Sequence, residues 1–213
     1  RHGAKSCIPN SERAVLACGM ARIASVSTAL PANSYSQDAI TDAIAPMITL
    51  DPGKQAVLRR MHGASGVRTR HLVMPIESYL DSTSFTRSNE LFVDVAVRLA
   101  GEALNSALVT AGLLPADVDY VMFTSVTGIS APSIDGLLVS RLGLRTDVKR
   151  VPMFGLGCVA GASGIARVND YLAGHPDDVA VLLSVELCSL TFQHDDDSMA
   201  NIVATGLFGD GAA

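Results

Sequence analysis

The sequence predicts an α/β protein whose strands form one buried, largely parallel sheet. Short, continuously apolar segments such as Val179–Val185 alternate with helical patterns, as expected for parallel strands covered on both faces. The chain of 213 residues is 48% hydrophobic and only 17% charged, which is enough for one sizeable core. Its 18 glycines and the lack of tryptophan suit a compact fold with tight turns.

The first third of the chain is expected to hold an extended segment followed by two helices. Residues 1–13 are polar and predict a disordered leader, so that residues 14–213 would form the folded body. Ala14–Ser27 reads as an extended, β-rich segment. Helical spacing of apolar residues follows in Gln37–Ile48 and in Gly53–His62.

The α/β alternation begins with the clearest amphipathic helix of the chain, Leu91–Leu108. Leu91, Val95, Leu99 and Leu104 lie on one side of it. The elements expected after it are the strand Asp119–Thr124, the helix Ile134–Leu142, the strand Lys149–Phe154, the helix Ala160–Ala173 and the strand Val179–Val185.

Charge and cysteine usage exclude several classes of protein. A net charge of −5 argues against a general nucleic-acid binder. The apolar stretch Val15–Leu30 is interrupted by Arg22 and is too short to span a bilayer, so no membrane span is expected. The four cysteines (Cys7, Cys18, Cys158 and Cys188) lack metal-site spacing. We therefore expect reduced thiols in a cytoplasmic protein.

Cys158 is the strongest candidate for a catalytic residue. It follows a short apolar strand that breaks on Gly155 and Gly157, and it precedes a helix. A thiol at this junction faces the positive end of the helix dipole, which favours the thiolate. The arrangement is that of a nucleophile elbow with cysteine in the nucleophile position. The alternative from the local pattern alone is a small buried apolar residue, which is the usual role of a free cysteine.

Several longer motifs give the chain a family resemblance. They are Arg141-Leu-Gly-Leu-Arg145, Lys149-Arg-Val-Pro152, Gly155-Leu-Gly-Cys-Val-Ala-Gly161, Glu186-Leu-Cys-Ser-Leu-Thr-Phe192 and Leu207-Phe-Gly-Asp-Gly-Ala-Ala213. In this order and spacing the chain resembles the N-terminal half of a type III polyketide synthase, the chalcone synthase-like branch of the thiolase superfamily. Within this family, the segments around Cys158 and Cys188 resemble those of bacterial enzymes that make alkylpyrones or alkylresorcinols from long acyl chains. The resemblance implies a thiolase-like, layered α-β-α-β-α fold, of which this chain is about the first of two similar halves.

The resemblance also implies roles for individual residues. Cys158 matches the nucleophile that carries the growing chain as a thioester, and Phe208 matches a gatekeeper between the CoA tunnel and the cavity. The positions that match the cavity lining are Cys188, Thr191 and Thr127, and Ala131 matches the position from which plant enzymes extend a methionine across the dimer interface into the partner's cavity. Without the resemblance, Cys188 and Phe208 would be read as core residues. The catalytic histidine and asparagine of the family would lie in the C-terminal half, outside this sequence.

A basic cluster is the candidate site for CoA phosphates. Residues 52–76 hold Lys54, Arg59, Arg60, Arg68 and Arg70 with no acid before Glu77. The functional reading is a phosphate clamp, since guanidinium groups fit phosphate oxygens, and Arg60 matches a CoA-contacting position of the family. The alternative is a solvated helix face. Val57 and Ala64 stand where plant members carry lysines.

The resemblance implies acyl-CoA and malonyl-CoA as substrates, no further cofactor, and a homodimer whose interface includes Val126–Pro132. Two rival functions stay open: a ketoacyl synthase III-type condensing enzyme, and a catalytically silent acyl-binding subunit of the same fold. The acidic run His194–Asp197 is read as a solvated loop rather than a metal site, so no metal is expected. Asp210 is expected to hold backbone N–H groups in its turn.

Overall fold

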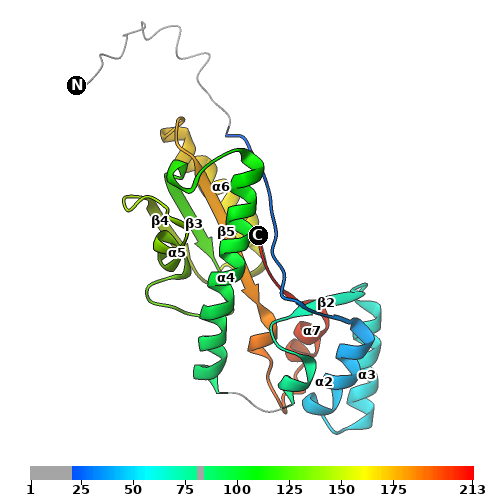
Figure 1. Cartoon of the computed structure of the whole chain (residues 1–213). Coiled ribbons are helices and arrows are strands. Elements are labelled where there is room, and N and C mark those ends of the chain that lie inside the picture. Colours follow the sequence, from blue (N-terminus) through cyan, green and yellow to red (C-terminus); the bar gives the residue numbers. More distant parts are fainter. Residues whose placement is uncertain (1–20, 81–83) are drawn as a thin grey trace, which may run out of the picture.

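The computed structural model describes residues 21–80 and 84–213. The predicted leader 1–13 and the first part of the predicted extended segment, residues 14–20, lie outside the described residues. Residues 21–28 belong to no strand, so the expectation of β-structure there is wrong. This segment instead runs along helix α4 (Phe85–Ala111), where the Ser25 hydroxyl donates to the Ala107 carbonyl at 2.8 Å (Figure 1).

A helical group lies at one end of the molecule, beside a two-stranded antiparallel sheet of β1 (Asn33–Ser36) and β2 (Thr69–Leu72). Helix α2 (Gln37–Ile48) matches its predicted bounds, and α3 (Pro52–Ala64) extends the prediction by one residue before and two after. Both begin at a side-chain cap. The Ser36 hydroxyl accepts from the Ala39 N–H, and the Asp51 carboxylate accepts from Gly53 and Lys54. Together with α7 (Met199–Leu207), these helices enclose an apolar core of their own.

The central sheet contains the strands β3 (Tyr120–Thr124), β4 (Lys149–Met153), β5 (Ala180–Leu187) and β6 (Asp210–Ala212). Their order is β4-β3-β5-β6; β3 is parallel to both neighbours, and β6 is antiparallel to β5. The three predicted strands thus lie in one sheet, as expected. All of β3 is buried, whereas β4 is an exposed edge strand, so the expectation of burial is wrong for β4.

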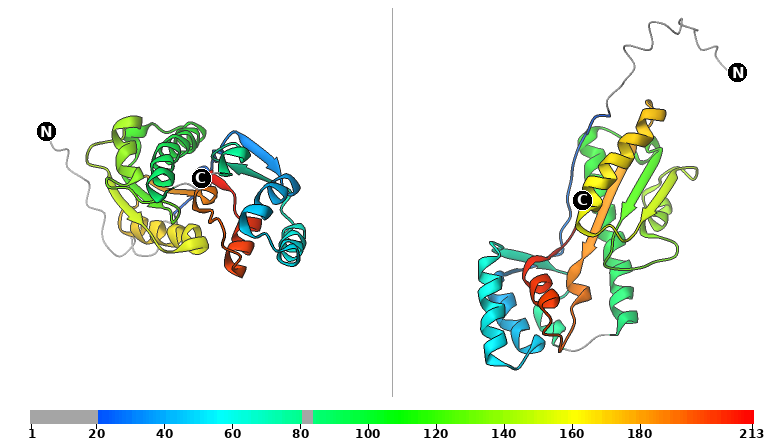
Figure 2. Two further views of the ribbon diagram at one scale, coloured as in Figure 1. Left: turned by 90° about the horizontal axis from the view of Figure 1, so that it is seen from below. Right: turned by 180° about the vertical axis from the view of Figure 1, so that it is seen from behind.

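Helices cover both faces of this sheet (Figure 2). Helices α4 and α5 (Ile134–Leu142) lie on one face, where Leu183 and Val185 of β5 join their core. Successive strand residues point to opposite faces, and Leu182 accordingly meets Gly164 of α6 (Ala160–Gly174) on the other. The outer side of α6 remains open within this chain: Ile165 is 54% exposed.

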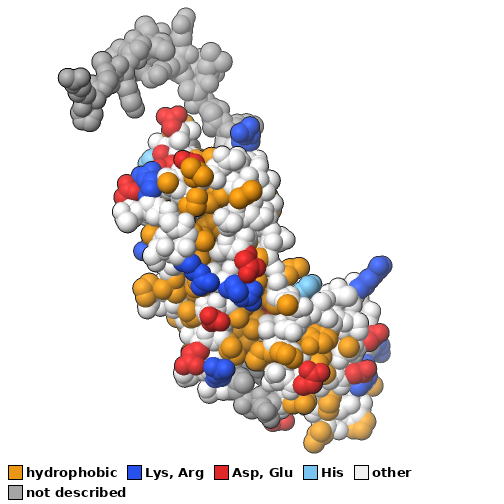
Figure 3. All heavy atoms as spheres, in the orientation of Figure 1, with side chains coloured by type: hydrophobic (Ala, Val, Ile, Leu, Met, Phe, Trp, Pro, Cys, Tyr) orange, Lys and Arg blue, Asp and Glu red, His pale blue; other side chains and the backbone are white. Residues whose placement is uncertain are grey.

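Short 3₁₀ turns connect these elements and contain several site residues. They are η1 (Ile76–Tyr79), η2 (Pro115–Asp117), η3 (Gly157–Val159) and η4 (Cys188–Thr191). On the face drawn in Figure 3, acidic and basic side chains are interspersed rather than gathered by sign. None of the helices within residues 21–80 and 84–213 combines the length and apolar character that a membrane span needs.

Candidate active site

The carboxyl ends of the parallel strands open into a cavity of about 540 Å³. Residues that follow β3, β4 and β5 form one side of it: Thr127, Cys158 and Cys188. The other side comes from the helical group and is mostly apolar, with Ile40 and Ile44 on α2 and Ile76 on η1. The cavity therefore combines a few polar groups at the sheet with an apolar opposite wall, which is the usual composition of a small-molecule site.

Cys158 lies in η3, two residues before α6, and its side chain is exposed at the cavity. Gly155 and Gly157 have φ values of 90° and 55°, a left-handed conformation that allows the sharp turn out of β4. No side chain of the described residues caps the amino terminus of α6; the Ala160 N–H donates to the Gly157 carbonyl, and the positive end of the helix dipole lies near the thiol. The predicted strand–turn–helix setting of Cys158 is confirmed, and the alternative of a buried core cysteine is wrong.

Cys188 differs from Cys158 in its surroundings, because it lies half-buried at the end of β5. Burial, reinforced by the charges of Asp210 and Glu186, raises the pKa of the Cys188 thiol to about 12. A thiol with that pKa stays protonated at neutral pH and is a poor nucleophile. The cavity thus holds two cysteines, of which only Cys158 has an exposed thiol next to a helix amino terminus.

The other predicted lining residues divide into two groups. Thr127, Thr191 and Phe208 line the same cavity as Cys158. The Thr127 hydroxyl accepts from the Leu187 N–H at 2.9 Å and so joins the loop after β3 to β5. Ala131 is not among the residues that line this cavity; it is exposed in the loop before α5 and is joined to Pro132 by a cis peptide bond, and its predicted place at the cavity of a dimer partner stays a prediction.

Arg60 also lies away from the cavity, on the exposed side of α3, and pairs with no acid among the described residues. The basic residues around Arg60 do not form one continuous positive surface. Lys54 pairs with Asp197 and Arg59 with Asp42, while Arg70 is buried. Arg60 therefore remains an exposed candidate for a phosphate contact, Arg68 of the same cluster is exposed as well, and the role of Arg60 stays a prediction.

Glu186 is a site residue that the sequence reasoning did not single out. It lines the cavity two residues before Cys188, and its carboxylate accepts from the Val126 N–H at 3.1 and 3.2 Å. Burial raises the pKa of this carboxyl group, although the hydrogen bonds that it accepts oppose the shift. Glu186 could have been identified from the sequence, because it is a single carboxylate near the end of the apolar strand β5.

A buried polar cluster supports the cavity wall near Cys188. Asp210 accepts from the Ser189 N–H at 2.8 Å and from the Val73 N–H at 2.7 Å, which confirms the expectation that it holds backbone N–H groups. The Ser189 hydroxyl also contacts the Tyr79 hydroxyl at 2.6 Å. Asp210 thus ties β6 to η4 and to the chain after β2. Within residues 21–80 and 84–213, no three potential metal-ligating side chains gather in one place.

The fold and the cavity define a class of protein. The fold is thiolase-like, and an exposed cysteine on a glycine turn before a helix, opening into an apolar cavity, is the arrangement expected of a nucleophile site. The family defined by the N-terminal domain of chalcone and stilbene synthases matches residues 8–213, and the chain belongs to this family.

Individual relatives agree with this assignment. The chain is 56% identical over 192 residues to 1,3,6,8-tetrahydroxynaphthalene synthase from Streptomyces peucetius subsp. caesius, which covers 90% of the chain and 50% of the relative. It is 28% identical over 200 residues to the alpha-pyrone synthesis polyketide synthase-like Pks18 of Mycobacterium tuberculosis, covering 91% of the chain and 50% of that relative.

The solved structure of 1,3,6,8-tetrahydroxynaphthalene synthase from Streptomyces coelicolor A3(2), a bacterial type III polyketide synthase, superposes with a TM-score of 0.82 at 30% identity. It covers 87% of this chain and 53% of that one. The chain therefore spans about half the length of the curated relatives that it matches.

Proposed function

We propose that this chain is the nucleophile-bearing half of a type III polyketide synthase. The Cys158 thiolate attacks the thioester carbonyl of an acyl-CoA, and the CoA thiol leaves. Malonyl-CoA then loses carbon dioxide, and the resulting carbanion attacks the enzyme-bound thioester. A thiolate suits both steps because it is a strong nucleophile and a good leaving group. The observation that carries the proposal is the exposed Cys158 on its turn at the mouth of an apolar cavity.

Two observations bear on the starter unit. The apolar wall formed by Ile40, Ile44 and Ile76 favours an apolar acyl chain, and hence a long-chain alkylpyrone or alkylresorcinol as product. The 56% identity to a tetrahydroxynaphthalene synthase favours the product class of that relative instead. Product analysis with malonyl-CoA alone and with an added long-chain acyl-CoA separates the two. Malonyl carrier protein as extender tests the rival ketoacyl synthase III function.

Further protein surface is expected to cover the open side of this half. The outer side of α6 is exposed at Ile165, and so is the edge strand β4. We infer that a second thiolase-like half packs there, and that the loop Val126–Pro132 contributes to a homodimer interface. Sedimentation of the full-length protein at micromolar concentration tests the dimer, and a monomer would contradict it.

Acylation of Cys158 tests the function directly. Full-length protein carrying this chain is incubated briefly with an acyl-CoA and its intact mass is measured. We expect one acyl adduct on the wild type and none on Cys158→Ala, since the protonated Cys188 thiol cannot replace it.

Cys188→Ala is the matched control and should still be acylated. An adduct that persists in Cys158→Ala, or that maps to Cys188, would show that the nucleophile is assigned wrongly. A wild type that is never acylated would support the silent acyl-binding subunit instead.

A further inference from the structure

A pair of buried side chains holds the backbone that presents Phe208. The Gln37 amide donates to the Gly206 carbonyl at 2.8 Å, and the Arg70 Nη1 donates to the Phe208 carbonyl at 3.0 Å. The two side chains are joined to each other, because Arg70 Nε donates to Gln37 Oε1 at 3.0 Å. We call Gln37 and Arg70 the carbonyl bracket.

The carbonyl bracket acts where the chain leaves α7 and enters β6. Helix α7 ends at Leu207, between the two carbonyls that are held, and its last carbonyls lack partners within the helix. The aliphatic part of Arg70 also lies against Gly209, the residue after Phe208. Backbone atoms on both sides of Phe208 are therefore fixed, whereas the Phe208 side chain is 42% exposed at the cavity.

The bracket is buried more deeply than a surface contact would require. Gln37 is 4% exposed and Arg70 is 7% exposed, and Arg70 Nη2 finds no hydrogen-bond partner among the described residues. A buried guanidinium with an unsatisfied donor is unfavourable, and burial lowers the pKa of Arg70, while the nearby charge of Asp210 opposes this effect.

We propose that Gln37 and Arg70 are positioning residues, which fix the place of the Phe208 ring and thereby the width of the passage to Cys158. This inference rests on the proposed function only in that Phe208 borders the path of the substrate to Cys158. Neither bracket residue needs to contact the reacting atoms, because each acts through a main-chain carbonyl beside Phe208. Loss of either bond should let the ring move and relax the discrimination by size at Cys158.

Size-graded alkylation of Cys158 tests the bracket without requiring polyketide synthesis. In the full-length protein, alkylation rates are measured for iodoacetamide and for N-dodecylmaleimide, with the site confirmed by peptide mass mapping. The ratio of the rate for N-dodecylmaleimide to that for iodoacetamide should rise about threefold to tenfold in Gln37→Met and in Arg70→Lys, the effect expected when one of the two hydrogen bonds to the backbone around Phe208 is lost. Phe208→Ala should give the highest ratio, because it removes the ring that the two side chains are proposed to position.

Gln55→Met is the matched control, because the Gln55 amide also donates to a main-chain carbonyl, that of Thr49 at 2.7 Å, away from the cavity. Its ratio should equal that of the wild type. General loosening of the fold would raise both rates together and leave the ratio unchanged.

An unchanged ratio in both bracket variants, or in Phe208→Ala, overturns the inference. If the ratio of alkylation rates changes in the bracket variants but acyl-CoA never acylates the wild-type protein, the positioning role of Gln37 and Arg70 is supported and the proposed function is rejected.

Discussion

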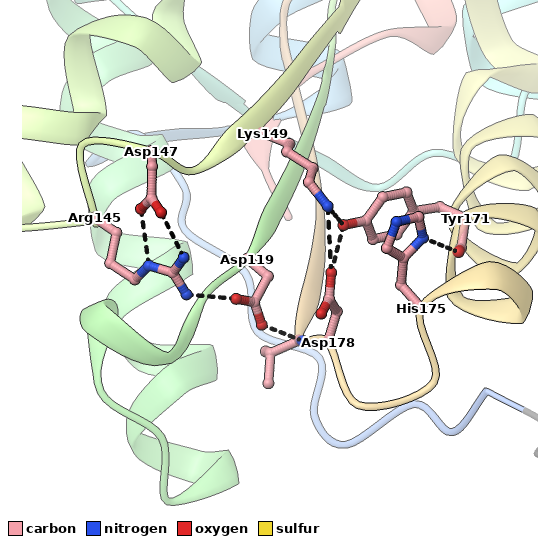
Figure 4. A network of polar contacts seen from close by, with 8 residues as sticks. Asp119, Arg145, Asp147, Lys149, Tyr171, His175 and Asp178 are labelled. Atoms are coloured by element: carbon pink, nitrogen blue, oxygen red, sulfur yellow. Dashed lines mark hydrogen bonds and ion pairs between the residues drawn. The ribbon is translucent and has the colours of Figure 1, made fainter. Parts of the chain in front are cut away.

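The two ends of the parallel sheet hold their strands together by different means. At the amino ends, exposed and half-buried charges form a network: Arg145 pairs with the exposed Asp147 and the half-buried Asp119, and Asp119 also accepts from the Val179 N–H at 2.9 Å (Figure 4). At the carboxyl ends, the buried Asp210 joins backbone segments beneath the cavity. Solvent can compensate for a lost partner only at the amino ends, so the same chemical change should have unequal effects.

Aromatic stacking adds to the network at the amino ends. Tyr171 stacks on Tyr120 at 4.1 Å and on His175 at 4.2 Å between ring centroids, and its hydroxyl links Lys149 to Asp178. The hydrogen bond from Tyr171 lowers the pKa of Asp178, although desolvation partly opposes this shift. At the cavity, burial instead raises the pKa of Glu186 and of Asp210. The pKa of Asp178 at the amino ends and the pKa values of Glu186 and Asp210 at the carboxyl ends are therefore shifted in opposite directions.

The largest effect should come from filling space at the cavity end. A Cβ atom at Gly206 would lie 2.4 Å from His62 Cδ2, and the His62 ring is held on both sides by Thr41 and the Ile202 carbonyl. Gly206→Ala should therefore lower the free energy of unfolding of the full-length protein by about 3 kcal/mol in denaturant titrations.

Gly63→Ala is the control, since a Cβ atom at Gly63 meets nothing within 4 Å in helix α3. It should raise the free energy of unfolding by about 0.5–1 kcal/mol, because alanine favours helix. Equal effects of the two substitutions would mean that the cavity end is not closely packed.

The second effect compares one acid from each end. Asp210→Asn should lower the free energy of unfolding by about 2 kcal/mol, because a single amide oxygen cannot accept all three donors from Ser189 and Val73. Asp119→Asn should cost about 0.5–1 kcal/mol, and less at high salt, where its pairing with Arg145 is screened. Unfolding titrations at low and high salt would contradict this contrast if Asp210→Asn were the salt-sensitive variant.

The smallest effect is a difference in pH dependence. Because the pKa of Glu186 is raised in the folded state, its ionised form opposes folding as the pH rises above the ordinary value near 4.3. Glu186→Gln should thus gain stability over the wild type between about pH 4 and 7, by at most about 1 kcal/mol. The lowered pKa of Asp178 has the reverse sign, so Asp178→Asn should lose stability above about pH 4 and match the wild type in acid.

Thermal unfolding from acid to neutral pH measures both variants. Parallel shifts for Glu186→Gln and Asp178→Asn would show that the two ends do not differ in the protonation of their acids.

Local patterns predicted most of the elements that carry the site. Helices α2 and α5 have their predicted bounds, and the strand–turn–helix around Cys158 follows from apolar spacing and two glycines. The shared cavity was predicted by the family resemblance and not by local patterns, and the residues that line it as expected are Cys158, Cys188, Thr127, Thr191 and Phe208. The prediction of β-structure for residues 21–28 was wrong because alternating apolar residues alone do not make a strand: Ile23 and Val26 remain exposed, and the Ser25 hydroxyl bonds to the Ala107 carbonyl of α4.

The sequence by itself determined the strand–turn–helix setting of Cys158, because a glycine turn and a following helix are local properties of the chain. Only the tertiary structure decided the burial of Cys188 and the hydrogen bonds of Glu186, Gln37 and Arg70. Gln37 meets Gly206 across 169 positions of the chain, and Arg70 meets Phe208 across 138. Burial and hydrogen bonds over such separations arise when the helical group packs against the sheet, and no local pattern encodes them.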